Sequence, residues 1–270
     1  MTIKKSAKPI PKIIKQPLPK KETHAPSTMR PLICLVGDDG LVKEYSFVFQ
    51  EKGIAVLEVK NLSTVKSSAK KITCAFELTL ECTDTKLKNL AVMDESLPAD
   101  VPIVSSTITS TLLSQSQSVK NKERFVGLAA FPTLIEHSLV ELAPSLYTKE
   151  EIVNNVKELF ASIKKETALV QDSVGMAMPR ILCQIINEAL FTVNFDIANP
   201  KAVDDAMKHA SQYPYGPIEW GERIGFQNIA SVLDALHSDH GEERYRVAPL
   251  LRQMAIAGTF WKTEENHTST

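Results

Sequence analysis

A turn that could hold phosphate lies at residues 37–42, at the end of the apolar run of residues 31–37. A helical pattern follows over residues 45–53, and a second apolar run covers residues 54–59. This order predicts a strand, a helix and a strand. In such a unit the first turn holds a dinucleotide pyrophosphate at the N-terminus of the helix. The chemistry to test for in this chain is therefore the binding of a dinucleotide.

The residue types in this turn do not suit that chemistry. A dinucleotide turn needs glycine at its first, third and sixth positions, and these positions are Gly37, Asp39 and Val42. Asp38 and Asp39 also place two carboxylates where two phosphate charges would lie. The acid that would bind the ribose hydroxyls is replaced by Lys60, which could meet only a 2′-phosphate. We predict that the fold is kept, that Gly37 is a remnant of the cofactor site and that dinucleotide binding is lost.

Helical signals dominate the last third of the chain. Asn199-Pro200 begins one helix with a cap and a proline at its first turn. Gly241 and Gly258 end two others. Between them lies a turn at residues 213–220 with two prolines and one glycine. A further helix has one long apolar face, made by Ile181, Leu182, Ile185, Ile186, Ala189, Leu190 and Val193.

Six short motifs follow one another in this helical stretch. They are Asp172-Ser-x-Gly175, Asn187-Glu188-Ala189, Asp204-x-Ala206-Met207, Tyr-Pro-x-Gly-Pro-x-Glu at residues 213–219, Ile224-Gly225 and Arg244-Tyr245-Arg246-x-x-Pro249. Their order resembles the C-terminal domain of 3-hydroxyacyl-CoA dehydrogenases, a helical dimerisation module that closes one side of the acyl-CoA site. The resemblance implies an α/β dinucleotide-binding-like (Rossmann) N-terminal domain followed by an all-α C-terminal dimerisation domain.

The same resemblance identifies the positions of the catalytic residues. A dehydrogenase of this family needs a base that titrates near neutrality, a carboxylate that orients it and two polar side chains on the substrate oxygens. In register, the histidine position is Ala129, the serine position is Ile108 and the asparagine position is Pro179. Only the carboxylate remains, as Glu141. We therefore identify the chain as a degenerate member, similar to 3-hydroxybutyryl-CoA dehydrogenases, with Glu141 as a remnant that lacks its partner.

Three further features bear on catalysis. Residues 61–71 are too few for the helical excursion that helps to hold coenzyme A in the family. Glu81 matches the family's acid at a strand end, although a strand-end carboxylate can be purely structural. His137 could replace the lost base, but its Ile-Glu-His-Ser context favours a polar surface position.

The composition is that of an ordinary globular protein. Of 270 residues, 43% are hydrophobic and 23% are charged, and no apolar run reaches the length of a membrane span. The four cysteines, Cys34, Cys74, Cys82 and Cys183, lack metal-ligand spacing and lie in apolar runs. We expect them to be reduced packing residues of a cytoplasmic protein without a metal site.

The first thirty residues carry a strong local charge. They hold eight of the 31 basic residues, one of the 32 acidic residues and five of the prolines. This pattern predicts an extended, disordered tail over residues 1–29. Such a tail could contact nucleic acid, an acidic lipid surface or an acidic partner. The lack of aromatic residues favours a solvated tail over nucleic-acid binding.

We predict four segments: the tail at residues 1–29, a degenerate Rossmann-like domain at 30–171, the helical domain at 172–261 and a second tail at 262–270. The expected protein has lost NAD binding and catalysis and needs no cofactor. It acts as a homodimer, or as a partner of an active paralogue or another protein, through the C-terminal helices. Two alternatives stay open. One is an active NAD(P)-dependent oxidoreductase with a rearranged site; the other is a binder of acyl-CoA or another small ligand that uses Glu141 and residues 213–220.

Overall fold

The structure is a computed structural model that describes residues 31–258. These residues lie in one compact unit. The predicted tails at residues 1–29 and 262–270 lie outside the described residues, as do residues 259–261. The predictions made for the tails therefore remain predictions.

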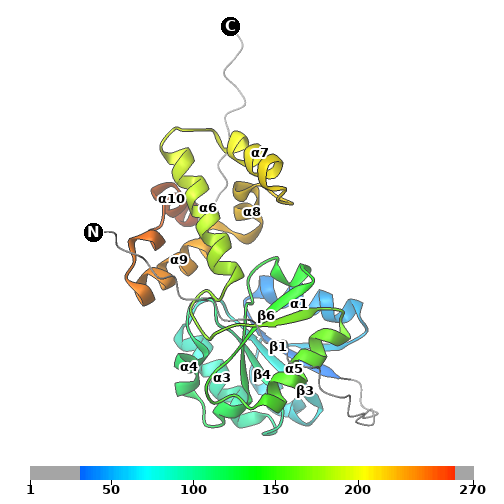
Figure 1. Ribbon diagram of the computed structural model, residues 1–270. Coiled ribbons are helices and arrows are strands. Elements are labelled where there is room, and N and C mark those ends of the chain that lie inside the picture. The colour runs from blue at the N-terminus through cyan, green and yellow to red at the C-terminus, as the bar shows by residue number, and fades with distance from the viewer. Residues whose placement is uncertain (1–30, 259–270) are drawn as a thin grey trace, which may run out of the picture. The chain divides into compact units, whose positions relative to one another are not determined.

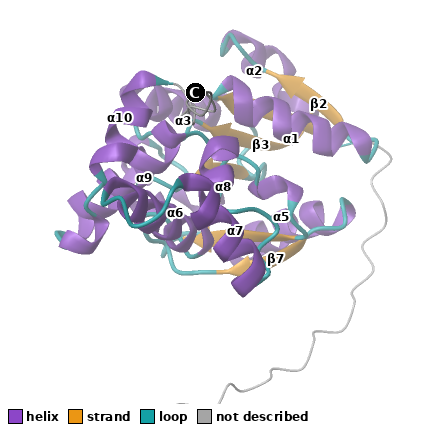
Figure 2. Ribbon diagram, turned by 90° about the horizontal axis from the view of Figure 1, so that it is seen from above, coloured by secondary structure: helices purple, strands orange, loops and turns teal. Residues whose placement is uncertain are grey.

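A seven-stranded sheet forms the first part of the described chain (Figure 1). The strand order is β2-β1-β3-β4-β5-β6-β7, so β2 and β7 are its edges (Figure 2). Neighbouring strands run parallel except β5 and β6, which are antiparallel. The predicted dinucleotide-binding-like domain is confirmed. The strands are β1 (Leu32–Gly37), β2 (Ala55–Glu58), β3 (Ile72–Leu78), β4 (Ile103–Ser106), β5 (Phe125–Leu128), β6 (Leu139–Pro144) and β7 (Glu166–Leu169).

Helices cover both faces of the sheet. On one face, α1 and α5 pack against it through Phe49, Phe76 and Phe160, whose ring centroids lie 5.5 to 6.5 Å apart. The other face packs against α2, α3 and α4. Because β1 is covered on both faces, it is a continuous apolar run rather than an alternating one. The helices are α1 (Asp39–Glu51), α2 (Ser63–Ser68), α3 (Asp84–Ser96), α4 (Leu112–Gln115) and α5 (Glu150–Ser162).

Five helices make up the rest of the described chain (Figure 1). The predicted boundaries are confirmed where local caps set them: Asn199 caps α7 through its side-chain oxygen, and Gly241 and Gly258 end α9 and α10. The prediction of a turn over residues 213–220 is wrong in its second half, since α8 begins at Pro217. The helices are α6 (Met178–Asn194), α7 (Pro200–Ser211), α8 (Pro217–Ile224), α9 (Phe226–His240) and α10 (Pro249–Ala257).

A carboxylate on α7 supplies the cap that α8 lacks in its own sequence. Asp204 accepts the backbone N–H groups of Ile218 and Glu219 at 2.8 and 3.0 Å. A Cβ at residue 216 would lie 2.2 Å from the Asp204 Cγ, so Gly216 leaves the room that this contact needs. The motif that begins at Asp204 and the motif at residues 213–219 are thus linked, because both are needed for this one cap.

The helical part shares a hydrophobic core with the C-terminal ends of the central strands. Ile108 and Ala129, which follow the ends of β4 and β5, belong to the same buried cluster as Leu182 and Ile186 of α6. The last strand ends at Leu169 and α6 begins at Met178. The predicted division between residues 171 and 172 falls in this connection and stays a prediction.

The cysteines follow the prediction with one exception. All four are free thiols. Cys34, Cys74 and Cys183 are buried, as expected for packing residues. Cys82 is exposed, because it lies in the loop after β3, and the packing role predicted for it is wrong.

Candidate functional site

The order of the strands reverses between β1 and β3, because β1 lies between β2 and β3. In open α/β sheets a dinucleotide binds at such a switch point, outside the carboxyl ends of the strands. Gly37 ends β1 there with a φ of +132°. A Cβ on Gly37 would lie 2.5 Å from backbone atoms of Leu78 and Thr79. The close approach of β1 and β3 is sufficient to require this glycine, whether or not a cofactor binds.

Asp38 spans the switch point. Its Oδ2 accepts the backbone N–H of Leu80, two residues beyond the end of β3, at 2.8 Å. Asp38 is also the residue that precedes the first turn of α1, but its side chain makes no bond to that helix. The carboxylate therefore links the turn after β1 to the segment after β3. A pyrophosphate at this place would meet a fixed negative charge, so the residues present do not fit it.

The next residue, Asp39, faces Lys60 across the end of the β1–β2 pair. The Asp39 carboxylate lies 3.9 Å from the Lys60 Nζ, and both side chains are largely exposed. Such a surface pair contributes only about 0–1 kcal/mol to stability. The position of the pair matters more than its energy. In the predicted register, Asp39 stands where a dinucleotide turn has its second glycine, and Lys60 stands where it has the ribose-binding acid. The two residues that replace cofactor-binding groups lie near one another.

The positions predicted for the catalytic serine, histidine and asparagine are part of the protein interior. Ile108, Ala129 and Pro179 are all buried. Ile108 and Ala129 also belong to the hydrophobic core that α6 to α10 complete. None of these three side chains can donate or accept a proton. The structure therefore places Ile108 and Ala129 in one apolar core and supplies no proton-transfer group at any of the three positions.

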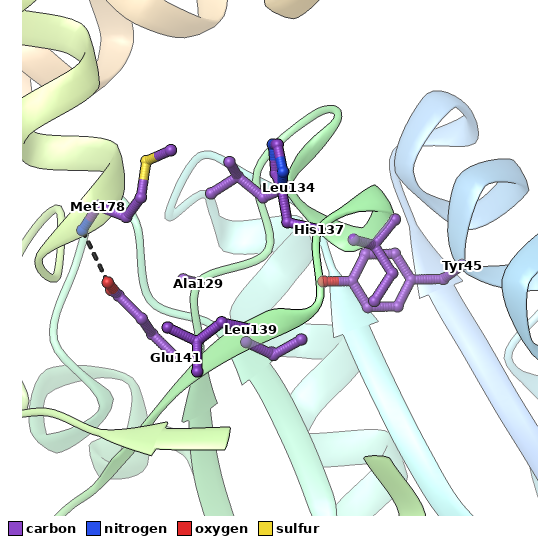
Figure 3. A pocket seen from close by; sticks show the side chains of 9 residues that line it. Tyr45, Ala129, Leu134, His137, Leu139, Glu141 and Met178 are labelled. Carbon is purple, nitrogen blue, oxygen red and sulfur yellow. Dashed lines mark hydrogen bonds between the residues drawn. The ribbon is translucent and has the colours of Figure 1, made fainter. Parts of the chain in front are cut away.

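Glu141 has a different partner from the one its position implies. Its two carboxylate oxygens accept the backbone N–H groups of Ala177 and Met178 at 3.0 and 2.8 Å (Figure 3). These residues are the N-cap and first residue of α6, whose first N–H groups lack partners within the helix. Glu141 thus has backbone partners at the start of α6, and the prediction that it lacks an imidazole partner stays a prediction. Its charge stabilises the positive end of a helix.

The remaining predicted candidates have separate roles. His137 is exposed, which confirms the predicted surface position, and its ring lies 6.4 Å from that of Trp220. Glu81 accepts the hydroxyl of Ser231 on α9 at 2.7 Å. Residues 61–71 contain only the short α2 and one turn of 3-10 helix, Ala69–Lys71.

A pocket of about 220 Å³ lies beside Ala129 (Figure 3). It opens between β6, the start of α6 and α1. Apart from Tyr45, His137 and Glu141 its walls are apolar. The residues that line it are Tyr45, Ala129, Leu134, Ile135, His137, Leu139, Val140, Glu141 and Met178. The residues 213–220 named with Glu141 as a ligand site do not line this pocket.

A buried ion pair lies at the end of β3, next to the switch point. The sequence analysis did not predict it. Glu77 and Lys86 are fully buried, with Lys86 Nζ 2.8 Å from the Glu77 carboxylate. Lys86 also donates to the Thr79 carbonyl at 2.6 Å, and Asn89 donates to Glu77 at 3.1 Å. An acid and a lysine nine residues apart give no signal in the sequence, because they meet only when α3 packs on β3. The pair fixes the backbone from which Leu80 donates to Asp38.

Within residues 31–258 no three His, Cys, Asp or Glu side chains are grouped so that they could hold a metal ion. No helix there is long and apolar enough to cross a membrane.

The sheet with its switch point and the helices that follow define a dinucleotide-fold protein with a helical C-terminal domain. Comparison with known families gives the same division. Residues 41–173 match the NAD binding domain of 3-hydroxyacyl-CoA dehydrogenase, and residues 175–268 match the C-terminal domain. The chain belongs to the 3-hydroxyacyl-CoA dehydrogenase family. The first match begins at residue 41, so the turn at residues 37–40 lies before it.

Relatives with assigned names agree with this family. The chain is 29% identical over 209 residues to a probable 3-hydroxybutyryl-CoA dehydrogenase of Bacillus subtilis, covering 77% of this chain and 72% of the relative. It is 29% identical to a 3-hydroxybutyryl-CoA dehydrogenase of Bradyrhizobium diazoefficiens, where it spans 67% of this chain and only 62% of the relative.

Solved structures show the same fold. The crystal structure of FadB2 from M. tuberculosis matches with a TM-score of 0.76 at 18% identity, over 86% of this chain and 95% of that one. The (S)-3-hydroxybutyryl-CoA dehydrogenase PaaH1 from Ralstonia eutropha matches with a TM-score of 0.68 at 22% identity, over the same shares. At these identities the likeness concerns the fold alone.

Proposed function

We propose that this protein is a non-catalytic member of its family, which has lost NAD binding and acts as a dimeric binding or partner protein in the fatty acid metabolism that its relatives serve. The observation that carries the proposal is the hydrogen bond from Leu80 to Asp38, which places a carboxylate across the switch point. Discrimination against a dinucleotide follows from repulsion of its phosphates and from the side chains that occupy the turn.

The catalytic positions support the same proposal. Oxidation of a 3-hydroxyl needs a base within hydrogen-bond reach of that hydroxyl. Ala129 carries only a methyl group, and the Glu141 carboxylate is bonded to the start of α6. A base would have to come from elsewhere, and His137 is the one imidazole that lines the pocket beside Ala129.

The proposed partner surface is on the C-terminal helices. Phe195, Ile197 and Ile256 expose 63%, 72% and 81% of their surface. Phe195 stacks on Phe191 with ring centroids 5.8 Å apart, so its ring is held in place at the surface. Large apolar side chains that are ordered and exposed are typical of protein interfaces. The partner is a second copy, an active paralogue or another protein.

The family matches favour one second candidate, an active NAD(P)-dependent 3-hydroxyacyl-CoA dehydrogenase with a rearranged site. Both matched domains are those of dehydrogenases. Lys60 would then serve a 2′-phosphate, and His137 would have to replace the histidine missing at residue 129. This candidate requires Asp38 to leave Leu80 when a cofactor binds.

The deciding experiment is the binding of NADH and NADPH to the full-length protein, followed by calorimetry. An active 3-hydroxybutyryl-CoA dehydrogenase serves as the positive control. We expect no binding at millimolar cofactor. A double variant, Asp38→Ala with Asp39→Gly, removes both carboxylates, and we expect it to gain measurable binding. Micromolar binding by the unaltered protein would overturn the proposal, and acyl-CoA oxidation would then be the next assay.

A further inference from the structure

The pocket beside Ala129 is lined by one tyrosine, Tyr45. Tyr45, on α1, is 1% exposed. Its ring packs against Phe49 and Phe76 at centroid distances of 6.5 and 6.1 Å, which fixes its direction. The hydroxyl points toward the centre of the pocket (Figure 3). Within residues 31–258 it has no hydrogen-bond partner among the side-chain contacts of the structure.

A hydroxyl that faces a pocket can bond to water or to a molecule bound there. The Tyr45 oxygen is not one of the fully buried atoms of residues 31–258 that lack a partner, so it is open to the pocket. Burial of the ring, with the neighbouring charge of Glu44, raises the pKa of Tyr45 well above its ordinary value. The hydroxyl therefore keeps its proton at neutral pH and is available as a donor. A molecule in the pocket that carries an acceptor would accept a hydrogen bond from it.

The walls of the pocket set the class of that molecule. Leu134, Ile135, Leu139, Val140 and Met178 offer apolar surface, and no lysine or arginine lines the pocket. An anion would enter without a positive partner and would approach a fixed carboxylate, because Glu141 is also a wall residue. An ion of either sign would also lose hydration against these mostly apolar walls, so the pocket favours an uncharged occupant that is mostly hydrocarbon.

The volume of the pocket limits the size of the molecule that it can bind. An apolar cavity of about 150 Å³ accepts benzene, whereas pockets for drug-sized molecules begin at about 300 Å³. A pocket of about 220 Å³ lies between these two. It suits a substituted ring or a short branched chain. Leu139 is about half exposed and His137 is exposed, so these two residues form the entrance.

We propose that the pocket is a binding site for a small neutral molecule, mostly hydrocarbon, whose single carbonyl accepts a hydrogen bond from Tyr45. The proposal depends on alanine at residue 129 and on the placement of Tyr45, and it holds whether or not the protein binds a dinucleotide. NADH binding tests the proposed function, and the pocket is tested with compounds that lack phosphate. Either proposal can therefore fail without the other.

Three probes of similar size and different polarity test it on the full-length protein. Acetophenone is neutral and carries one carbonyl. Cumene has a benzene ring and a substituent of similar size but no acceptor. Benzoate has the same ring with a negatively charged substituent. Binding is followed by chemical-shift changes of backbone amides. We expect acetophenone to bind with a Kd on the order of 0.1–1 mM, and cumene and benzoate to bind at least about fivefold more weakly.

Two tyrosine variants test whether the Tyr45 hydroxyl donates the proposed hydrogen bond to the carbonyl. Tyr45→Phe keeps the ring and removes the hydroxyl, so we expect it to weaken acetophenone about five- to tenfold and to leave cumene within twofold. Tyr147→Phe is the matched control, since Tyr147 is 41% exposed and lies outside this pocket. We expect it to change neither affinity. The proposal is overturned if acetophenone does not bind, if benzoate binds more tightly, or if Tyr45→Phe leaves the affinity for acetophenone unchanged.

Discussion

Glu141 illustrates how a carboxylate in a fixed position can serve a helix instead of an imidazole. Its two oxygens accept N–H groups from Ala177 and Met178. A negative charge is stabilising at this end of a helix because the first N–H groups are unpaired and the helix dipole is positive there. Asp38 is a second case, since its carboxylate accepts the N–H of Leu80 instead of leaving room for a phosphate.

The role of Glu141 predicts the effect of removing its charge. Glu141→Gln keeps one acceptor oxygen but turns an amide donor toward an N–H group, so we expect a loss of about 1–2 kcal/mol in the free energy of unfolding. Urea denaturation measures this loss. Glu123→Gln, which removes an exposed ion pair with Lys149, is the control and should leave the free energy of unfolding unchanged within experimental error. Equal stability of both variants and the unaltered protein would show that the cap contributes nothing.

At this scale the sequence predicts which groups are missing but not where the remaining ones bind. Alanine at residue 129 and aspartate at residue 39 can be found by register alone. The partners of Glu141 and Asp38 are 36 or more residues away in the chain, at Ala177 and Leu80. Nothing in a single sequence marks such long-range pairs. For the same reason Tyr45, which packs within an apolar helix face, gave no sign that its hydroxyl reaches a pocket.

At the scale of elements, the accuracy of a predicted boundary depends on whether its cap is local. Asn199 caps its own helix, and the start of α7 follows from the sequence. The start of α8 does not, because its N–H groups are accepted by Asp204 from the preceding helix. For the sheet, the apolar runs at residues 31–37 and 54–59 predict the first two strands, and the fold class follows from the family resemblance. The antiparallel β6 was not predicted, since its direction depends on pairing with β5.

The contact between α7 and α8 predicts a difference between two glycines. Gly216→Ala puts a methyl group 2.2 Å from Asp204 Cγ, so Asp204 must move and α8 loses its cap. We expect a loss of about 1–3 kcal/mol in the free energy of unfolding. Gly40→Ala, in the first turn of α1, meets no atom within 4 Å and should stabilise the protein by about 0.5–1 kcal/mol. Thermal or urea unfolding of both variants checks this, and a neutral Gly216→Ala would contradict the contact.

At the scale of the whole molecule, the core that joins the strand ends to α6 through α10 is as important as the sheet. Ile108 and Ala129 occur in that core together with apolar residues of the helices. A polar serine or histidine at these positions would have to be accommodated next to those side chains. If these are the catalytic positions, as proposed, the apolar residues that remove the catalytic groups are the same residues that complete this core.

The proposed partner surface predicts an effect on assembly. Phe195→Ser removes an apolar ring from the end of α6, and we expect it to shift the protein from dimer to monomer in light scattering after gel filtration. Phe47→Ser is the matched control, because Phe47 on α1 is equally exposed, at 63%. It should leave the mass unchanged. A monomer before any substitution would instead direct the search to another partner protein.

The cap that Glu141 provides for α6 also limits how this chain can change by descent. If catalysis was given up as proposed, a later mutation of Ala129 to histidine would find its former carboxylate already engaged. The new imidazole would have to share that carboxylate with the start of α6, and it would still lack a serine at residue 108 and an asparagine at residue 179, so a single reversion would restore no catalysis. Selection acts on single steps, and each would have to be useful by itself. Under the proposed function, several substitutions would therefore have to occur together before catalysis returned.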